Sequence, residues 1–425
     1  MQPSSAKAPM ASHKARVQPM CADTHQLGVA RCFALVRTDL FYKHVPRYRR
    51  VANVAQANLA SAAAKAYYGP LGPAQLIQAY NLPSAKAGSG QTVGIVDAGD
   101  DPTAESDLAQ YRKAFNIAAC TTANGCFSKL NQNGKTSPLP AANPGWAGEI
   151  SLDLDMVSAI CPNCKIVLIE AKTASFKDLG TSVGTAAKAG AHQISNSYGG
   201  PECIVNKKGK IQCGSPLPAA KYYSIKNTII TASSGDSSWF AGPQAPADFQ
   251  TVVSVGGTSI YPYNNSRGWL ETGWTGAGSS CSVFVTRPSW VPKSTACPNQ
   301  QGKKAGSMRP ISDVSAVADP YTGVLVYESY PFSQAGFYVY GGTSVASPII
   351  ASVYALAGNS SSQHYGAKLY TASSSSLTDV LIGKNGIPGL ANNAGQGCVP
   401  TAICAAMAGW DGPTGNGTPW GVGAF

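Results

Sequence analysis

Three short stretches of this sequence carry side chains that could take part in catalysis. A glycine turn in "GGTSVASP" delivers Ser344 to the start of an apolar segment that is typical of a helix. Serine is preferred where a helix begins, so a helix cap is one interpretation. The alternative is a nucleophile, which needs a base for its proton and donors that hold the oxyanion.

Histidine, the usual base for a serine nucleophile, offers no clear partner. The five histidines are His13, His25, His44, His192 and His364. The first three lie in a basic amino-terminal region, and the other two lead into a predicted strand or lie in a polar segment. We therefore expect solvated or structural roles for all five.

Two carboxylates offer another base. The stretch "GWAGEISLDLDMVSAICP" has a helical pattern, and Glu149 and Asp153 share one face at positions i and i+4. If that face is buried, the pair will share a proton and one apparent pKa will rise, which makes a carboxylate a competent base. The alternative is a solvated acidic face that also includes Asp155.

The third stretch is "SSGDS", in which Asp236 stands in a glycine turn after an apolar strand. An ionised aspartate would repel an oxyanion, whereas a protonated one can donate a hydrogen bond to it. Such chemistry favours acid pH. By itself the Gly-Asp-Ser sequence is also an ordinary turn.

Apolar runs that alternate with helical patterns must position these residues. The runs lie at 91–98, 164–171, 191–200, 227–236 and 251–262. This alternation predicts an α/β fold with a doubly wound, mainly parallel sheet, whose active site lies at the carboxyl ends of strands. Asp97, Ser197 and Asp236 stand at such ends. The last third is loop-rich, so we expect one catalytic domain with decorations.

The net charge of +11 is concentrated near the amino terminus. Residues 1–66 hold ten basic side chains against two acidic ones, and the densest basic run lies at 45–54. No aromatic-interleaved or zinc-finger pattern accompanies it, so nucleic acid is not an expected partner. We expect a basic amino-terminal arm or reduced leader over 1–69, either solvated or autoinhibitory.

The twelve cysteines fall in close succession along the chain, at positions 21/32, 120/126, 161/164, 203/213, 281/297 and 398/404. This arrangement predicts six local disulfides and an oxidising compartment. Zinc bound through Cys161 and Cys164 is the alternative, but no second ligand pair stands at the required spacing. The apolar run "LGVARCFALV" is broken by Arg31 and does not form a signal peptide.

Together "GEISLD", "SSGDS" and "GGTSVASP", in this order, resemble the sedolisin family of serine-carboxyl peptidases, which includes kumamolisin. The resemblance covers about residues 70–425. It implies a subtilisin-like fold with Ser344 as nucleophile, Glu149 as base and Asp153 as the residue that orients Glu149. Protonated Asp236 would supply the oxyanion contact, and Asp97 would be an outer carboxylate or a structural one.

The resemblance also implies one structural calcium ion near the carboxyl terminus. "LTDVLIGKNG" and "AMAGWDGPTGNGTP" match the two halves of the family's site, in a segment of about 377–415. The ligands it implies are the Asp379 and Asp411 carboxylates and the backbone carbonyls of Val380, Met407 and Gly409. Calcium prefers such oxygen ligands.

We therefore expect a secreted, disulfide-stabilised, acid-acting serine-carboxyl endopeptidase, with a peptidase domain over 70–425. Its partners would be protein or peptide substrates, without nucleic acid or membrane, and the chain would be a monomer. Two alternatives are a tripeptidyl exopeptidase of the same family and a catalytically idle binding scaffold. "SNSYGG" and the loop "GWTGAGSSCS" are candidate contacts for an extended peptide.

Overall fold

The computed structural model describes residues 16–24, 26–46, 69–293, 297, 304–387, 391–398 and 401–425. His13, His25 and most of the basic run at 45–54 lie outside these ranges. Within them, no helix combines the length and apolar character needed to cross a membrane.

The central sheet confirms the predicted doubly wound α/β fold. Its order is β14-β13-β11-β7-β4-β6-β5, and β17 also pairs with β13. The strands are β4 (Thr92–Ala98), β5 (Phe127–Asn131), β6 (Lys165–Ala171), β7 (Gln193–Asn196), β11 (Ile229–Ser233), β13 (Val253–Pro262), β14 (Trp269–Gly273) and β17 (Val314–Val317). All pairs are parallel except β13 with β14. The chain order reverses direction at β4, so the carboxyl ends of β4 and β7 form the switch point at which such folds place their sites.

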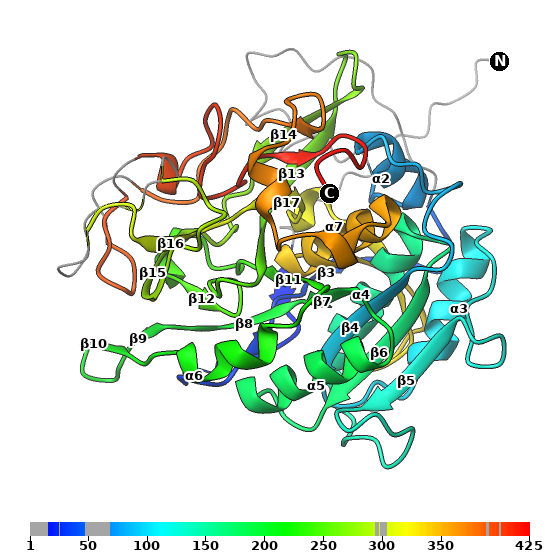
Figure 1. Ribbon diagram of the computed structural model, residues 1–425. Helices are drawn as coiled ribbons and strands as arrows, with labels where there is room; N and C mark the ends of the chain where they lie inside the picture. The colour runs from blue at the N-terminus through cyan, green and yellow to red at the C-terminus, as the bar shows by residue number, and fades with distance from the viewer. Residues whose placement is uncertain are drawn as a thin grey trace, which may run out of the picture.

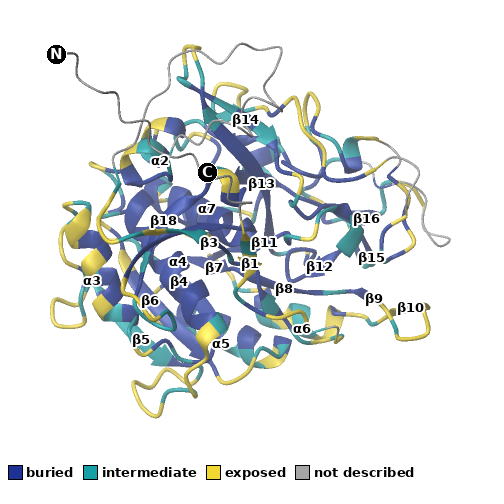
Figure 2. Cartoon of the chain, turned by 180° about the vertical axis from the view of Figure 1, so that it is seen from behind, coloured by how far each residue is buried: buried dark blue, intermediate teal, exposed yellow. Residues whose placement is uncertain are grey.

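Helices cover both faces of this sheet, which is why its strands are apolar on both sides (Figure 1). The helices are α2 (Pro73–Ala79), α3 (Ala104–Ala114), α4 (Pro144–Ile160), α5 (Phe176–Lys188), α6 (Leu217–Ala220) and α7 (Thr343–Ala357). Along β4, Val93 and Ile95 belong to the core that contains α4 and α7, whereas Val96 and Ala98 belong to the core that contains α5. Figure 2 shows these strands and α7 buried, with exposed stretches at α3 and β10.

The amino-terminal residues are built into the fold. Strands β1 (Val17–Pro19) and β3 (Leu35–Tyr42) join β18 (Val324–Glu328) and β19 (Gly336–Gly341) in the sheet β1-β3-β19-β18. Between them, β2 (Arg31–Cys32) pairs with β8 (Tyr198–Pro201), whose other neighbour is β12 (Gln244–Ala245). The blue strand β3 accordingly lies in the middle of the molecule in Figure 1. Residues 31–32 and 35–42 of the predicted arm are therefore strands of the fold.

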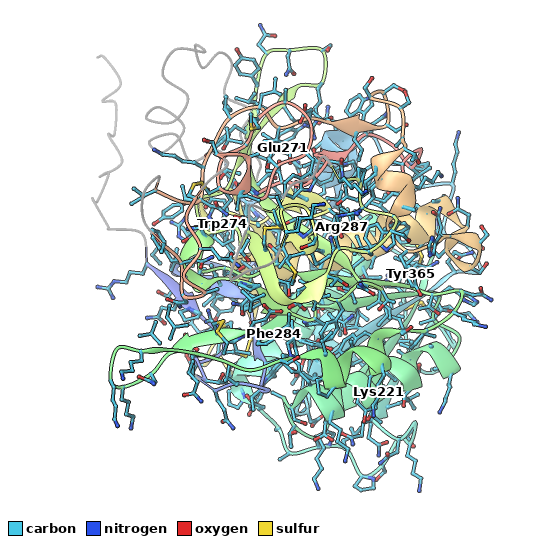
Figure 3. The ribbon with its side chains drawn as sticks, turned by 60° about the vertical axis from the view of Figure 1, so that its left-hand side comes forward. Lys221, Glu271, Trp274, Phe284, Arg287 and Tyr365 are labelled. Atoms are coloured by element: carbon cyan, nitrogen blue, oxygen red, sulfur yellow. A yellow bond between two sulfur atoms is a disulfide. The ribbon has the colours of Figure 1, made fainter. Side chains whose placement is uncertain are left out.

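The carboxyl-terminal third is rich in loops, as the sequence predicts. Besides β17, β18 and β19, it contains two short strand pairs, β15 (Ser280–Thr286) with β16 (Met308–Ile311) and β20 (Leu377–Thr378) with β21 (Thr418–Pro419). Glu271 on β14 joins this region to the sheet, because it accepts hydrogen bonds from Thr258 and Thr418. Figure 3 shows Glu271 in the upper part of the view, Trp274 nearer the middle and Lys221 in the lower part.

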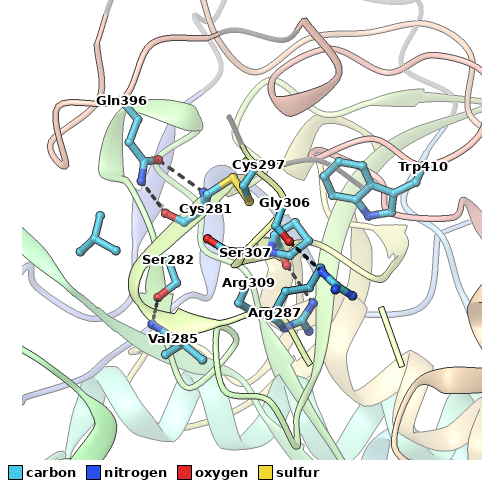
Figure 4. Close-up of a disulfide and its surroundings, with 12 residues drawn as sticks. Cys281, Ser282, Val285, Arg287, Cys297, Gly306, Ser307, Arg309, Gln396 and Trp410 are labelled. Atoms are coloured by element: carbon cyan, nitrogen blue, oxygen red, sulfur yellow. Dashed lines mark hydrogen bonds between the residues drawn. A yellow bond between two sulfur atoms is a disulfide. The ribbon is translucent and has the colours of Figure 1, made fainter. Parts of the chain in front are cut away.

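Six disulfides join the cysteines as sequence neighbours, which confirms the predicted local pairing. Cys161 and Cys164 are therefore bonded to each other, and the zinc alternative is wrong. Cys203 and Cys213 close the hairpin of β9 (Cys203–Val205) and β10 (Ile211–Cys213). At the Cys281–Cys297 bond, the Gln396 side chain hydrogen-bonds both the N–H and the carbonyl of Cys281 (Figure 4).

Candidate active site

Ser344 lies in the first turn of α7, and its side chain is fully buried. The interpretation of Ser344 as the helix cap is wrong, because the cap position belongs to Gly342, whose φ of 99° suits only glycine. Ser344 Oγ is 2.8 Å from Glu149 Oε2 and 3.1 Å from the carbonyl oxygen of Ser197. The serine hydroxyl therefore donates toward a carboxylate, as a nucleophile with a general base requires.

Glu149 and Asp153 project from α4, which packs against α7. Asn143 caps α4 by accepting hydrogen bonds from the N–H groups of Gly145 and Trp146, and Pro144 occupies the first helical position. Glu149 and Asp153 are both fully buried, so the alternative of a solvated acidic face is wrong. Burial raises the pKa of both carboxyls well above their ordinary values, and the Asp97 charge raises them further.

The carboxyls of Glu149, Asp153 and Asp97 form one buried group. Asp97 lies at the end of β4, and burial raises its pKa to about 8. Glu149 Oε1 and Asp153 Oδ2 are buried and have no hydrogen-bond partner among the described residues. Neighbouring carboxyls in a low-dielectric interior cannot all ionise, so they share protons at acid pH.

Ser197 links helices α4 and α7. Its Oγ donates to Asp153 Oδ1 at 2.7 Å, and its carbonyl oxygen accepts from Ser344 Oγ. The sequence identified Ser197 only as a polar residue near the end of a strand, within "SNSYGG". In the structure it follows β7 directly and positions both the serine and the outer carboxylate.

Asp236 lies across Gly342 from the serine, after β11. Its Oδ1 accepts hydrogen bonds from the N–H and the Oγ1 of Thr343, both at 2.7 Å. Its Oδ2 is buried without a hydrogen-bond partner in the described part of the chain. Burial raises the pKa of Asp236 to about 7. Because Oδ1 is already an acceptor, the proton that Asp236 carries at acid pH resides on Oδ2.

The amino-terminal segment passes directly over these groups. The sequence left a solvated and an autoinhibitory arm open and named no residue of this contact. The Ala34 N–H donates to Glu149 Oε2 at 2.8 Å, the same oxygen that accepts from Ser344. The Phe33 N–H donates to the Ser197 carbonyl at 3.2 Å. The sequence feature that could have predicted a strand here is the apolar run around Arg31. Its length and the nearby Cys21/Cys32 pair are both consistent with a strand.

The five expected calcium ligands gather in one loop region. Asp379 Oδ2 accepts from the Gly409 N–H at 2.8 Å, and Asp411 Oδ2 accepts from the Met407 N–H at 3.1 Å. Burial, with a smaller contribution from the charge of Asp379, raises the pKa of Asp411 to about 7. Among the described residues, no hydrogen bond is donated to the carbonyls of Val380, Met407 or Gly409. Adjacent carboxylates and free carbonyls form a donor set that fits a hard cation.

None of the three described histidines makes a hydrogen bond to Ser344, and His44 is exposed. His192 Nδ1 is 3.0 Å from the Asn227 carbonyl, and the His364 ring lies against Tyr365. The titratable side chain that contacts Ser344 Oγ is thus the carboxyl group of Glu149.

Comparisons with known proteins give this arrangement a family. The chain matches the subtilase family over residues 88–397. Kumamolisin from Bacillus sp. (strain MN-32) is 28% identical over 410 residues, which are 92% of this chain and 68% of the relative. Sedolisin from Pseudomonas sp. (strain 101) is 25% identical over 414 residues, 90% of this chain and 65% of the relative. This chain belongs to the sedolisin family of subtilases.

A solved structure of Pseudomonas sedolisin, described as a serine-carboxyl proteinase complexed with two molecules of pseudo-iodotyrostatin, has the same fold as this sedolisin-family chain. The TM-score is 0.65 at 25% identity, and the match covers 82% of this chain and 95% of that one. Tripeptidyl-peptidase sed4 from Aspergillus fumigatus is 26% identical over 411 residues, 82% of this chain and 64% of the relative. The chain thus spans about two thirds of the length of these curated relatives. The family's chemistry is peptide-bond hydrolysis by a serine peptidase.

Proposed function

We propose that the protein is a secreted serine-carboxyl endopeptidase that acts at acid pH through an acyl-enzyme on Ser344. The observation that carries this proposal is the shared oxygen Glu149 Oε2, which accepts from Ser344 Oγ and from the Ala34 backbone N–H. One carboxylate oxygen is thus within reach of a nucleophile and of a peptide nitrogen. That is the position a general base needs if it is later to protonate a leaving amine.

Acylation follows from these contacts. The hydrogen bonds from Ser344 and Ala34 favour the ionised form of Glu149, so Asp97 and Asp153 hold the shared protons of the buried group at acid pH. Ser344 Oγ adds to the substrate carbonyl carbon while its proton passes to Glu149 Oε2. Glu149 then gives the proton to the departing amide nitrogen as the C–N bond breaks. Asp153 orients Glu149, and the Ser197 hydroxyl holds Asp153 through the 2.7 Å hydrogen bond. Water repeats the cycle on the ester, with Glu149 again as the base.

The oxyanion of the tetrahedral intermediate is held by protonated Asp236 and by the N–H groups at the start of α7. A helix start directs free N–H groups and a positive partial charge at an anion. Asp236 can donate only while Oδ2 is protonated, and burial holds its pKa at about 7. Above that pH its charge opposes the oxyanion, which supports an acid-acting enzyme.

The path of the amino-terminal segment favours endopeptidase action over tripeptidyl action. The Ala30 N–H donates to the Ala174 carbonyl at 2.8 Å, and Val29 bridges Ser175. Counted from Phe33, these residues lie at and beyond the fourth position toward the amino terminus. A tripeptidyl peptidase needs a closed end after the third residue, whereas this groove continues. The name of the Aspergillus relative keeps the tripeptidyl alternative open to test.

The proposal includes one structural calcium ion held by the Asp379 and Asp411 carboxylates and the carbonyls of Val380, Met407 and Gly409. The bound cation would neutralise two adjacent carboxylates and tie the carboxyl-terminal loops to the domain. None of these residues contacts Ser344 or Glu149, so the ion would serve stability.

The experiment that tests this function is digestion of a long unstructured peptide at about pH 4, with mass spectrometry of the products. We expect internal cuts by the unmodified chain and no cuts by Ser344→Ala, with both proteins folded by circular dichroism. If all products were tripeptides, the protein would be a tripeptidyl exopeptidase and not an endopeptidase. Equal cleavage by Ser344→Ala would contradict the mechanism, and no cleavage by any form would favour a binding scaffold.

A further inference from the structure

Strands β9 and β10 form a hairpin that projects from the body of the molecule (Figure 1). Strand β9 begins one residue after β8, and Ser197, which contacts Ser344, directly precedes β8. The hairpin turns over residues 206–210, and the Cys203–Cys213 disulfide closes its base. The hairpin is therefore a direct continuation of the segment that contacts the nucleophile.

Hydrogen bonds within the hairpin and at its base hold it in one shape. The Asn206 side chain accepts from the N–H groups of Lys208 and Lys210 at 2.9 and 3.1 Å, and the Asn206 N–H donates to the Lys210 carbonyl at 2.9 Å. At the base, the buried Glu202 carboxylate accepts from the Val283 N–H at 2.7 Å. A surface that is fixed in this way loses little conformational freedom when a partner binds.

The hairpin presents positive charge to the solvent. Lys207, Lys208 and Lys210 are exposed, and in the described part of the chain no ion pair or side-chain hydrogen bond engages their ammonium groups. The stretch 203–227 holds five lysines and no acidic residue, whereas the rest of 67–425 holds 17 basic and 19 acidic side chains. The positive charge of the domain is thus gathered on one lobe, which attracts an anionic partner.

Two apolar side chains accompany these lysines. Val205 and Ile211 lie opposite each other on the two strands, and 49% of each is exposed. Exposed apolar side chains next to lysines suit a polypeptide, which carries both apolar and acidic side chains. A sulfated polysaccharide would contact the lysines and leave the apolar pair in water.

The path of the amino-terminal segment shows how a bound chain reaches this hairpin. The Ala34 N–H donates to Glu149, so Phe33 stands directly before the catalytic groups. From there the segment runs back along β8 to Leu27, whose Cδ1 would lie 3.0 Å from a Cβ on Gly214. Gly214 directly follows β10, and an open hollow of about 310 Å³ adjoins both residues. A substrate that takes this path meets the base of the hairpin at the seventh residue before the cut.

The chain itself places an acidic residue beside the hairpin. Asp23 stands at the eleventh position on the same path, counted from Phe33. It lines a hollow of about 280 Å³ together with Ile204 and Val205 of β9. The surroundings of the hairpin therefore accommodate an acidic side chain from the upstream part of a chain that occupies the cleft.

We propose that the β9–β10 hairpin is an exosite, a binding surface outside the catalytic groups, for acidic segments of polypeptide substrates upstream of the cut. This inference rests on the proposed peptidase function and adds a substrate class to it. An extended chain advances about 3.3 Å per residue, so about four substrate residues span the distance from the base of the hairpin to its turn. Acidic side chains at about the eighth to eleventh positions before the cut therefore reach the three lysines.

This preference depends on pH through the carboxylates of the substrate. Glutamate has an ordinary pKa of about 4.3, so it is mostly neutral at about pH 3 and mostly ionised at about pH 5, while lysine stays charged throughout. Burial raises the pKa of Asp236 to about 7, so the proposed oxyanion donor is still protonated at the higher of these pH values. The preference for acidic substrates should thus rise with pH while the catalytic groups stay competent.

The first test uses two peptides that differ only in charge. Both contain a bond that the unmodified chain cuts in the long unstructured peptide, and the eighth to eleventh residues before it are all Glu or all Gln. We expect kcat/KM to be about tenfold higher for the glutamate peptide at about pH 5, through a lower KM, and nearly equal at about pH 3. Equal cleavage of both peptides at both pH values would overturn the exosite and leave the peptidase function standing. No cleavage of either peptide would instead contradict the proposed function.

The hairpin variant Lys207→Gln/Lys208→Gln/Lys210→Gln removes the three charges. It keeps the turn, because the contacts to Asn206 use backbone N–H groups. We expect this variant to cut both peptides with nearly equal kcat/KM and to retain the activity of the unmodified chain on the glutamine peptide. A variant that keeps the tenfold preference would overturn the assignment to the hairpin.

A control variant with the same change in net charge is Lys113→Gln/Lys165→Gln/Lys188→Gln. These lysines are exposed and lie at the edge of the sheet where its strands begin, since Lys165 starts β6 and Lys188 ends the helix before β7. We expect the control variant to keep the preference for the glutamate peptide. Loss of the preference in both variants would show a general effect of charge and overturn the exosite.

Two further measurements fix the position and the class of the partner. A third peptide carries the four glutamates at the same distance after the bond, and we expect no gain in kcat/KM from it, because the hairpin lies on the upstream side. An equal gain from either side would overturn the proposal. Binding of the unmodified chain, but not of the hairpin variant, to a heparin column, combined with equal cleavage of the glutamate and glutamine peptides, would assign the surface to a polysaccharide and also overturn it.

Discussion

Asp236→Asn tests the proton on which the oxyanion contact depends. The substitution keeps the shape of the side chain, and the amide oxygen can still accept from Thr343 at the place of Oδ1. The amide NH₂ then occupies the place of Oδ2 and can donate at every pH. A protonated aspartic acid and an asparagine should therefore be interchangeable at acid pH and should differ at neutral pH.

The size of the difference follows from the pKa. Burial raises the pKa of Asp236 from 3.8 to about 7. This difference corresponds to a cost of about 4 kcal/mol for the buried charged form. A raised pKa means that the folded state holds the proton more tightly. The stability that protonated Asp236 contributes to the folded state is fully present below pH 3.8, declines as pH rises, and is lost by about pH 7. We expect the free energy of unfolding of the Asp236→Asn variant to equal that of the protein with Asp236 at low pH. At neutral pH we expect the variant to be more stable by up to about 4 kcal/mol.

The assay is urea unfolding followed by tryptophan fluorescence, from about pH 4 to about pH 7. Both proteins carry Ser344→Ala, which prevents self-digestion. Asp178→Asn, at the half-exposed first turn of α5, controls for the loss of one negative charge. A stability difference between the protein with Asp236 and its Asp236→Asn variant that does not change with pH would refute the reasoning. Asp236 would then ionise normally and could not donate to an oxyanion.

Three further predictions concern the base, the peptide groove and the calcium loop. Glu149→Gln should lower kcat on a test peptide by about 10²–10⁴-fold with an unchanged fold, because an amide at the place of the carboxylate is not a base. Glu105→Gln on α3 is the control, and comparable activity of the two variants would exclude Glu149 as the base. Gly199→Ala should lower kcat/KM for peptides with Phe before the cut by about tenfold more than for peptides with Ala there, because its Cβ would lie 2.8 Å from the Phe33 ring; an unchanged ratio would place the aromatic side chain elsewhere. Chelation of calcium should lower the Tm of the unmodified chain. Asp411→Asn should have this lowered Tm already, with no further change when chelator is added. The same response to chelator in both proteins would show that Asp411 does not bind calcium.

Local patterns in the sequence were enough to predict the sheet and its helices. The apolar run before Asp97 became β4, and the helical spacing of Glu149 and Asp153 became α4. These signals are local, because residues on one helix face or one strand recur at fixed intervals. The sequence could not decide whether the acidic face of α4 is buried. That depends on α7 and on the amino-terminal segment, which lie far away along the chain.

The amino-terminal segment shows the same limit more sharply. Residues 1–69 were expected to form an arm or leader, yet β2 and β3 complete two sheets and Phe33 reaches the active site. Long-range strand pairing is set by partner strands and leaves little trace in a short apolar run. The interpretation of Ser344 as a cap failed for a different reason. Gly342, with its φ of 99°, takes the cap, and Asp236 supplies the acceptor that a capping side chain would otherwise provide.

The central claim is that Ser344 becomes acylated while Glu149 handles its proton, and trapping the acyl-enzyme tests it most directly. The unmodified chain is mixed with an excess of a long unstructured peptide near pH 4 and quenched within one turnover, and the mass of the tryptic peptide that contains Ser344 is then measured. We predict an added mass equal to the peptide's amino-terminal half on Ser344, and its absence in Glu149→Gln. Rapid hydrolysis with a burst of released amine but no adduct on Ser344, or an adduct on another residue, would contradict the account.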